Sequence, residues 1–284
     1  MIPVRIVAPD AMWVTLETGR GDDVASTPLE RDGDAWVGAV EAGTTYGLRA
    51  DGDGPRFDPT KVLLDPRATE VWFPPGHDRQ RAAEHGVDNA GHAPLAVARD
   101  RPAPRPPRWS SRPPVVYEAH VDGFTHRRPC PDAGTFRGLT AELPRLAALG
   151  VSVVELLPVH QNDPHEGSYW GYMPLAFAAV EQRYGTDEDL AELIGVAHAH
   201  DIEVWLDVVF NHTTEVDESG PTYSLRGLAY AVAYRHDDEG RYIETTGCGH
   251  DVDITSPAMQ ELIRWSLDRL ADLGVDGFRF DLAP

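Results

Sequence analysis

The chain has 284 residues, of which 42% are hydrophobic and 25% charged, as expected of a globular protein with a sizeable core. Its 25 Lys and Arg against 46 Asp and Glu give a net charge of −21, which argues against nucleic acid or an anionic membrane as a partner because both would repel it. Two cysteines, Cys130 and Cys248, are too few for a disulfide framework. No stretch has the pattern of a signal peptide or a membrane-spanning helix, so we expect a cytoplasmic protein with a neutral substrate.

Residues 1–100 have the pattern of an antiparallel β-sandwich. Short apolar segments rich in β-branched and aromatic residues occur at Met12–Leu16, Ala35–Val40 and Thr45–Arg49. Asp-Gly pairs at 32–33 and 51–52 are typical of hairpin turns, and no helix is predicted. We therefore predict an N-terminal β-sandwich domain over residues 1–100.

Residues 101–114 contain six prolines in fourteen residues. Proline removes a backbone donor and restricts the chain to extended conformations. This segment is predicted to be an extended, semi-rigid linker between two domains.

Residues 115–284 alternate between strands and helices. Strands are predicted at the four segments Val115–Val121, Val151–Val159, Ile202–Phe210 and Val275–Leu282. Helices are predicted around Ala141–Leu149, after a capping box that starts at Thr186, and after Ser256–Pro257, where Ser256 would be the N-cap. This order predicts a parallel sheet with right-handed crossovers.

Two architectures fit that order, a doubly wound sheet and a (β/α)8 barrel. No glycine-rich phosphate loop follows the first strand, which disfavours a dinucleotide-binding sheet. The long segments Gln161–Tyr184 and Thr213–Thr255 both follow the C-terminal ends of strands, where a barrel carries its active-site loops. The barrel interpretation implies that residues 115–284 supply its first four strands.

Candidate site residues cluster at the ends of these strands. Arg279 and Asp281 lie two residues apart on one strand, so their side chains point to the same side, and the guanidinium would keep the carboxylate ionised as a nucleophile requires. Asp207 and His212 end the preceding strand and suit the binding of sugar hydroxyls. A structural ion pair and a core histidine are the alternatives.

Aromatic residues Trp170 and Tyr172 flank a glycine in the loop after the second predicted strand. Aromatic faces can stack on the C–H faces of sugar rings, so this loop favours a glycan ligand. Core packing beneath a long loop is the alternative.

These segments carry a family resemblance. Residues 207–212 (DVVFNH) and 277–283 (GFRFDLA) resemble two signature regions of the α-amylase superfamily of glycoside hydrolases, and 154–159 (VELLPV) resembles its second-strand motif. Residues 117–125 (YEAHVDGFT), 169–175 (YWGYMPL), 220–227 (GPTYSLRG) and 246–249 (TGCG) narrow the resemblance to isoamylase-type bacterial glycogen-debranching enzymes. Residues 57–66 (FDPTKVLLDP) resemble the end of that branch's N-terminal β-sandwich.

The resemblance implies a retaining hydrolase of α-glucan. Asp281 would be the nucleophile and Arg279 would hold it ionised, while Tyr172, His212 and Asp207 would bind or support the sugar beside the cleaved bond. Asn211 matches a calcium ligand of many amylases, but this branch does not generally depend on that site, so no cofactor is expected.

The acid/base glutamate and the second aspartate of the family have no counterpart in this sequence. We therefore expect an N-terminal portion of a glycogen-debranching α-1,6-glucosidase that is inactive as a chain of this extent. A trehalose-releasing hydrolase, a branching enzyme and a non-catalytic α-glucan-binding fragment are the alternatives.

Overall fold

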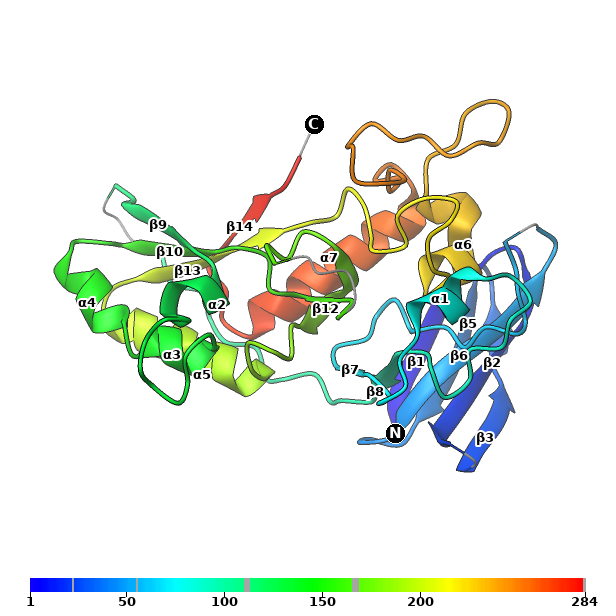
Figure 1. Ribbon diagram of the computed structural model, residues 1–284, viewed down its shortest axis with the longest axis horizontal. Helices are drawn as coiled ribbons and strands as arrows, with labels where there is room; N and C mark the ends of the chain where they lie inside the picture. The colour runs from blue at the N-terminus through cyan, green and yellow to red at the C-terminus, as the bar shows by residue number, and fades with distance from the viewer. Residues whose placement is uncertain (22, 55, 110–112, 165–168, 283–284) are drawn as a thin grey trace.

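The computed structural model describes residues 1–21, 23–54, 56–109, 113–164 and 169–282 (Figure 1). Residue 168, which precedes the aromatic motif, and residues 283–284, which end the last signature region, lie outside these ranges. Two halves lie side by side: antiparallel sheets form one end of the molecule and a parallel sheet with its helices forms the other. The long helix α7 runs between them (Figure 1).

The N-terminal half contains two antiparallel sheets, with strand orders β1-β5-β4 and β3-β2-β6-β8-β7. The strands are β1 (Ile2–Val7), β2 (Ala11–Arg20), β3 (Asp23–Pro28), β4 (Glu30–Asp32), β5 (Ala35–Val40), β6 (Thr45–Gly52), β7 (Val71–Trp72) and β8 (Leu95–Val97). Alternate residues of both sheets, such as Ile6, Leu16 and Leu48, are buried in one hydrophobic cluster. The two sheets therefore pack face to face around a common core.

Three local expectations for this half have different outcomes. The Asp32–Gly33 step forms the predicted turn, and Gly33 has a φ of 61° between β4 and β5. The turn predicted at Asp51–Gly52 is wrong, because both residues pair with β2 as the end of β6. The expectation of no helix is also wrong, since α1 (Arg79–Ala83) forms there.

Helix α1 escaped prediction because it is a single short turn without an apolar stripe. Only Ala82 of its five residues is buried. Its start is fixed instead by Asp78, whose carboxylate accepts hydrogen bonds from the amides of Gln80 and Arg81. Local capping, not burial, defines this helix.

The C-terminal half is built on a parallel sheet with the order β14-β13-β10-β9, which does not close into a barrel. Its strands are β9 (Val116–Ala119), β10 (Val153–Leu156), β13 (Glu203–Val208) and β14 (Gly277–Phe280). Side chains that alternate with Glu155 and Asp207, such as Val154 and Leu206, pack into the helix-covered core. Glu118, Glu155, Trp205, Asp207 and Arg279 share the opposite side, here called the open face.

The helices of this half are α2 (Val121–Thr125), α3 (Phe136–Thr140), α4 (Leu143–Ala148), α5 (Asp187–Ala199), α6 (Leu225–Ala233) and α7 (Pro257–Asp272). The capping box at Thr186 and Asp189 forms as predicted. The helix predicted around 141–149 forms as α4, with Pro144 in its first turn, and α3 is a separate short helix before it. Ser256 is the N-cap residue of α7 and is followed by Pro257, as predicted, although the Ser256 hydroxyl makes no capping hydrogen bond.

The long segments 161–184 and 213–255, expected to be loops after strands, contain regular secondary structure. The first contains a hairpin of β11 (His160–Asn162) and β12 (Pro174–Val180), and the second contains α6. Apolar residues of β12 and α6, including Leu175 and Leu228, belong to the same buried cluster as the N-terminal sheets. The N-terminal core therefore extends onto β12 and α6, while the parallel sheet and its helices enclose a second core.

Residues 101–109 and 113–114 have no regular secondary structure, as predicted for the linker. Hydrogen bonds attach this segment to Asp276, just before β14, and to α5. The amide of Arg108 donates to Asp276 Oδ1 at 2.5 Å, and the Arg108 guanidinium donates to the carbonyl of His198 at 2.8 Å. Nearer its start, the Arg101 side chain pairs with Asp272.

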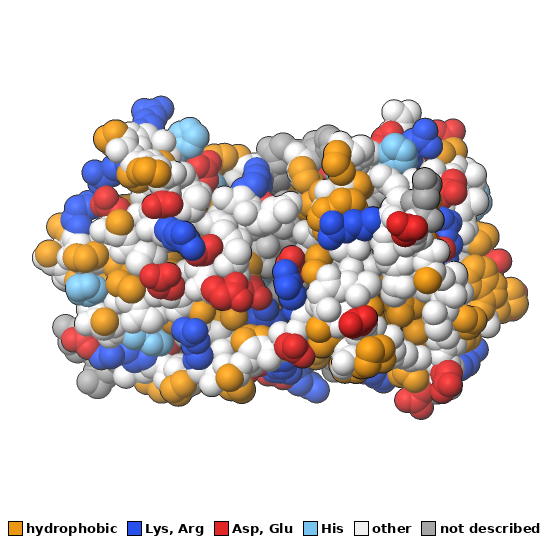
Figure 2. All heavy atoms as spheres, turned by 90° about the horizontal axis from the view of Figure 1, so that it is seen from below, with side chains coloured by type: hydrophobic (Ala, Val, Ile, Leu, Met, Phe, Trp, Pro, Cys, Tyr) orange, Lys and Arg blue, Asp and Glu red, His pale blue; other side chains and the backbone are white. Residues whose placement is uncertain are grey.

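Charged side chains of both signs are spread over the face of the molecule in Figure 2. In Figure 2, acidic and basic side chains are interspersed with apolar ones, so the negative charge of the chain is not gathered there into one patch. A cleft of about 610 Å³ lies between the halves and is lined by both signs of charge, including Glu70, Arg99, Arg101 and Asp187. In the described part of the chain, no helix is long and apolar enough to cross a membrane.

Candidate active site

The site begins where β13 and β14 run side by side. Their parallel register places Asp207 directly opposite Arg279 on the open face. Nη1 of Arg279 donates to both oxygens of Asp207, at 3.0 and 3.1 Å, and to Oδ1 of Asp281 at 2.8 Å. One guanidinium therefore joins the carboxylates of two neighbouring strands.

Asn211 and His212 approach Asp281 from the segment that follows β13. Nδ2 of Asn211 donates to Oδ2 of Asp281 at 3.2 Å and to its carbonyl at 3.3 Å. Oδ1 of Asn211 lies 2.6 Å from Nδ1 of His212, whose Nε2 lies 2.6 Å from the carbonyl oxygen of Tyr172. His212 thus connects Asp281 to the aromatic loop through Asn211.

Tyr172 closes this network. Its hydroxyl donates to Oδ2 of Asp207 at 2.5 Å. Five of the residues singled out from the sequence, Asp281, Arg279, Asp207, His212 and Tyr172, are therefore linked with Asn211 by continuous hydrogen bonds. They come from segments up to 109 residues apart, from 172 to 281.

Burial sets the protonation of these groups. It raises the pKa of Asp207, and the hydrogen bonds from Tyr172 and Arg279 oppose that rise. Burial lowers the pKa of His212, and the hydrogen bond to the Tyr172 carbonyl opposes that shift. Burial and the bond to Asp207 raise the pKa of Tyr172 far above its ordinary value, which keeps its hydroxyl a hydrogen-bond donor.

Trp170 lies apart from this network. Its side chain is 59% exposed and contacts His120 and Tyr169 edge-on, at ring distances of 6.3 and 5.9 Å. Tyr169 in turn stacks on His120 at 4.3 Å. The three rings form an aromatic group beside the loop, whereas no described hydrogen bond links Trp170 to Asp207 or Asp281.

The sequence interpretation omitted two acidic residues of the open face. Glu155 and Glu118 pair across β10 and β9, and burial together with the charges of Asp207 and Glu118 raises the pKa of Glu155. Glu155 lies opposite Trp205, two residues before Asp207, and is therefore one layer deeper in the sheet. Strand alternation was the signal that could have placed it on the same face.

Cys248 also lies close enough to Asp281 to be affected by its charge. Burial and then Asp281 raise the pKa of this thiol, so it remains protonated at neutral pH. Asn211, the position that matches a calcium ligand, is already engaged through both amide atoms. Within the described ranges, no three His, Cys, Asp or Glu side chains are grouped to hold a metal ion.

Comparison with known proteins agrees with this geometry. The family model for the α-amylase catalytic domain matches residues 86–221. A glycogen debranching enzyme of Klebsiella pneumoniae is 37% identical over 89% of this chain, and a glycogen operon protein GlgX homolog of Haemophilus influenzae is 38% identical over 90%. The chain is therefore similar to the α-amylase catalytic domain over 86–221, and to glycogen-debranching relatives over most of its length. Both relatives also support the predicted glycogen-debranching branch.

The chain spans 44% and 43% of the length of these two relatives. Among solved structures, a pullulanase of Paenibacillus barengoltzii complexed with maltotriose superposes on 99% of this chain with a TM-score of 0.77. That pullulanase is 24% identical and the match covers 47% of it, so the likeness concerns the fold. The solved pullulanase supports an amylase-type architecture of which this chain forms about half.

Proposed function

We propose that this chain is part of a retaining glycoside hydrolase that cleaves α-1,6 branch points of an α-glucan such as glycogen. The architecture proposed with it is an N-terminal β-sandwich over 1–100, a linker over 101–114, and the first four strands of a (β/α)8 barrel over 115–284. The open face of β9, β10, β13 and β14 would be the interior of that barrel. Its substrate would be a neutral oligosaccharide or polysaccharide, in agreement with the acidic net charge of −21.

The single observation that carries the proposal is the hydrogen-bonded network at the ends of β13 and β14. Two carboxylates of this network contact Arg279. The side chain of Asp281 is 16% exposed and that of Asp207 is 4% exposed, so Asp281 is the more accessible of the two. An accessible, ion-paired carboxylate suits a nucleophile that attacks the anomeric carbon and forms a covalent glycosyl intermediate. Asp207 is saturated by Arg279 and Tyr172 and suits a supporting role.

The other roles follow from position. The ring of Tyr172, fixed through its hydroxyl, would stack on the sugar beside the cleaved bond. His212, whose ring nitrogens contact Asn211 and the Tyr172 carbonyl, would support the sugar site by holding the Tyr172 backbone in place. Trp170, with its exposed ring, would contact a sugar farther from the bond. The mechanism also requires a general acid about 5 Å from the nucleophile. In the described part of the chain, Asp207 is the only other carboxylate hydrogen-bonded to the Arg279–Asp281 pair.

Two measurements test the proposal. Maltotetraose should bind the purified chain, as followed by calorimetry, and Tyr172→Ala should weaken that binding by about tenfold because one stacked ring is worth roughly 1–3 kcal/mol. Tyr230→Ala is the matched control, since this tyrosine lies on α6 and makes no described contact with the site network. Unchanged affinity in Tyr172→Ala, or equal losses in both variants, would remove Tyr172 from the sugar site.

A non-catalytic α-glucan-binding role is the second candidate, and one observation favours it. The aromatic group of His120, Tyr169 and Trp170 presents an exposed surface of the kind that binds sugar rings, and it needs no second carboxylate. Trehalose release and branch transfer remain alternatives within the catalytic proposal. Product analysis of an enzyme completed with the remaining barrel strands of a debranching relative distinguishes these reactions.

A further inference from the structure

Arg79, a residue of the N-terminal half, contacts both chain segments that carry site residues from the loops. Its guanidinium donates to Oδ2 of Asp163 at 2.8 Å, and to the carbonyl and hydroxyl of Thr214 at 3.1 and 3.4 Å. Asp163 begins the connection that leads to Tyr172, and Thr214 lies two residues after His212. One planar, forked side chain therefore bridges the two segments from outside.

The two segments also contact one another next to this bridge. The amide of Thr214 donates to the carbonyl of Pro174 at 3.0 Å, and His212 Nε2 lies 2.6 Å from the carbonyl of Tyr172. Thr214 therefore bonds the aromatic loop through its N–H and Arg79 through its C=O. A shift of Thr214 would move His212 and the Tyr172 backbone together.

Asp163 is the buried anchor of the bridge. Its side chain is fully buried and also accepts the hydroxyl of Tyr223 at 2.8 Å, while Nε2 of His77 lies 3.2 Å from its other oxygen. A buried carboxylate requires a compensating charge, and the guanidinium of Arg79 supplies it. The pairing is consequently hard to exchange for water.

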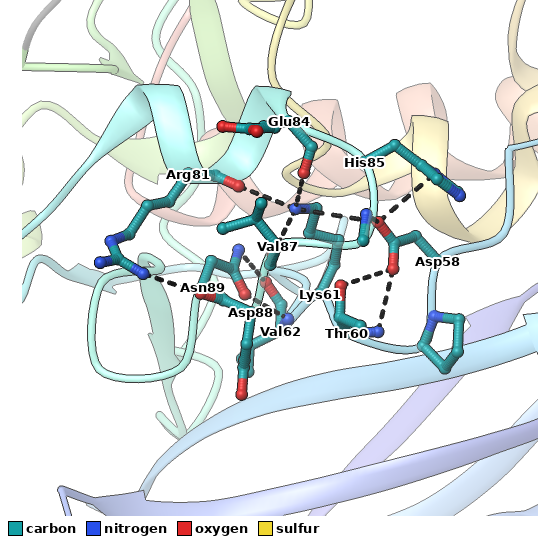
Figure 3. A network of polar contacts seen from close by, with 12 residues as sticks. Asp58, Thr60, Lys61, Val62, Arg81, Glu84, His85, Val87, Asp88 and Asn89 are labelled. Carbon is teal, nitrogen blue, oxygen red and sulfur yellow. Dashed lines mark hydrogen bonds and ion pairs between the residues drawn. The ribbon is translucent and has the colours of Figure 1, made fainter.

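The helix that carries Arg79 is itself held rigidly, by the contacts in Figure 3. Lys61 is 1% exposed, and its ammonium donates to the carbonyls of Arg81, Glu84 and Val87 at 2.5–2.7 Å. Asp58 lies 3.8 Å from the same nitrogen. The three carbonyls belong to α1 and the turn after it. The buried Lys61 ammonium therefore attaches α1 and this turn to the connection between β6 and β7.

We propose that Arg79 is a positioning residue for the sugar site: it fixes the relative placement of Tyr172 and His212 by bridging Asp163 and Thr214 from the Lys61-anchored helix α1. The expected effect of Arg79 on sugar binding rests on the proposed function. The bridge from Asp163 to Thr214 does not depend on that function. It assigns the N-terminal half a direct influence on the site.

Hydrogen exchange of the intact chain tests the structural part without any sugar. Arg79→Met removes the fork and keeps the aliphatic stem, and peptides that cover 169–176 and 211–216 should exchange about tenfold faster or more. Arg49→Met is the matched control: Arg49 is 18% exposed against 24% for Arg79, and it bonds Glu17, Pro59 and Asp88 within the N-terminal half. Unchanged exchange at these peptides in Arg79→Met, or a rise that is equal throughout the chain or equal in Arg49→Met, overturns the proposal.

Arg79→Lys separates bridging from simple charge. A lysine can pair with Asp163 but has a single ammonium and cannot span to Thr214 with a fork. The amides of peptide 211–216 should therefore exchange faster in Arg79→Lys, while those of peptide 169–176 should stay protected. Full protection of both peptides in this variant would show that the fork is unnecessary and would refute the bridge.

Maltotetraose affinity tests the consequence. Arg79→Met should weaken binding by about tenfold, and Arg49→Met should stay within about twofold of the unsubstituted chain. If the exchange result holds but affinity does not change, Arg79 does not position the sugar site. If the unsubstituted chain binds no maltotetraose, the proposed function fails for this chain while the exchange result still decides the bridge.

Discussion

The substitution Arg279→Met tests the part of the site at β13 and β14 most directly. It removes three hydrogen bonds from one nitrogen, two to Asp207 and one to Asp281, and leaves the stem in place. Breaking a fully buried ion pair costs about 3–5 kcal/mol, and breaking an exposed pair costs about 0.2–1 kcal/mol. Because the Arg279 side chain is 46% exposed and that of Asp207 only 4%, we expect the free energy of unfolding to fall by about 1–3 kcal/mol at pH 7.

The loss should depend on pH in a defined direction. Burial already raises the folded-state pKa of Asp207, and removing the guanidinium that opposes this rise raises it further. Between the unfolded and the folded pKa the native state holds more protons, so stability falls as pH rises through that window. The variant should therefore be destabilised strongly at about pH 7 and weakly at about pH 4, near the ordinary pKa of an aspartate.

The assay is urea unfolding of the chain followed by tryptophan fluorescence, since Trp205 lies on β13 beside the site. Asp207→Asn in the Arg279→Met background should recover most of the loss, because it removes the uncompensated charge. Arg235→Met is a matched control: Arg235 is 47% exposed and pairs with a buried Asp251, but Asp251 keeps two donors from Thr245. Equal destabilisation at both pH values, or no recovery in the double variant, would refute the role assigned to Arg279.

Three further predictions concern chemistry and the open sheet. In an enzyme completed with the remaining barrel strands, Asp281→Asn should abolish turnover and leave oligosaccharide binding within about threefold; more than a few per cent of residual activity, in a reducing-sugar assay, would exclude Asp281 as nucleophile. The purified 1–284 chain should release no reducing sugar from glycogen or pullulan, since general-acid catalysis alone contributes ~10²–10⁴ in rate; release that Asp281→Asn eliminates would contradict this. The chain should bind a hydrophobic dye strongly, because Val116 and Phe280 on the two edge strands are 44% and 45% exposed, and weak dye binding with a sharp melt would disprove it.

The strand-borne half of the site could be predicted from sequence because strand periodicity carries the information. Arg279 and Asp281 are two residues apart, so they face the same side in any strand. The opposition of Asp207 to Arg279 required only that consecutive strands of a β-α-β unit be neighbours, which they are here.

The rest of the site depended on long-range side-chain contacts that no local pattern encodes. Asp163, Arg79 and Thr214 lie far apart in sequence, and each alone has the character of an ordinary loop or helix residue. The extension of the N-terminal core had the same difficulty, since Leu175 and Leu228 sit in segments interpreted as loops although they pack against the N-terminal sheets. The Asp51–Gly52 turn failed because tertiary pairing with β2 overrode a local turn preference.

The site residues on β13 and β14 and those in the segments that follow strands should respond differently to substitution. Asp207 and Arg279 are held by strand register, and a one-residue slip would turn both side chains to the opposite face of the sheet. Tyr172 and His212 are held by individual hydrogen bonds to Asp207 and to one another, and Thr214, two residues after His212, is bonded by Arg79 of the N-terminal half. Substitutions at that junction can therefore shift Tyr172 and His212 by small steps while the Asp207–Arg279–Asp281 arrangement stays fixed. Differences in substrate preference between related chains should accordingly be sought around Asp163 and Thr214 rather than along β13 and β14.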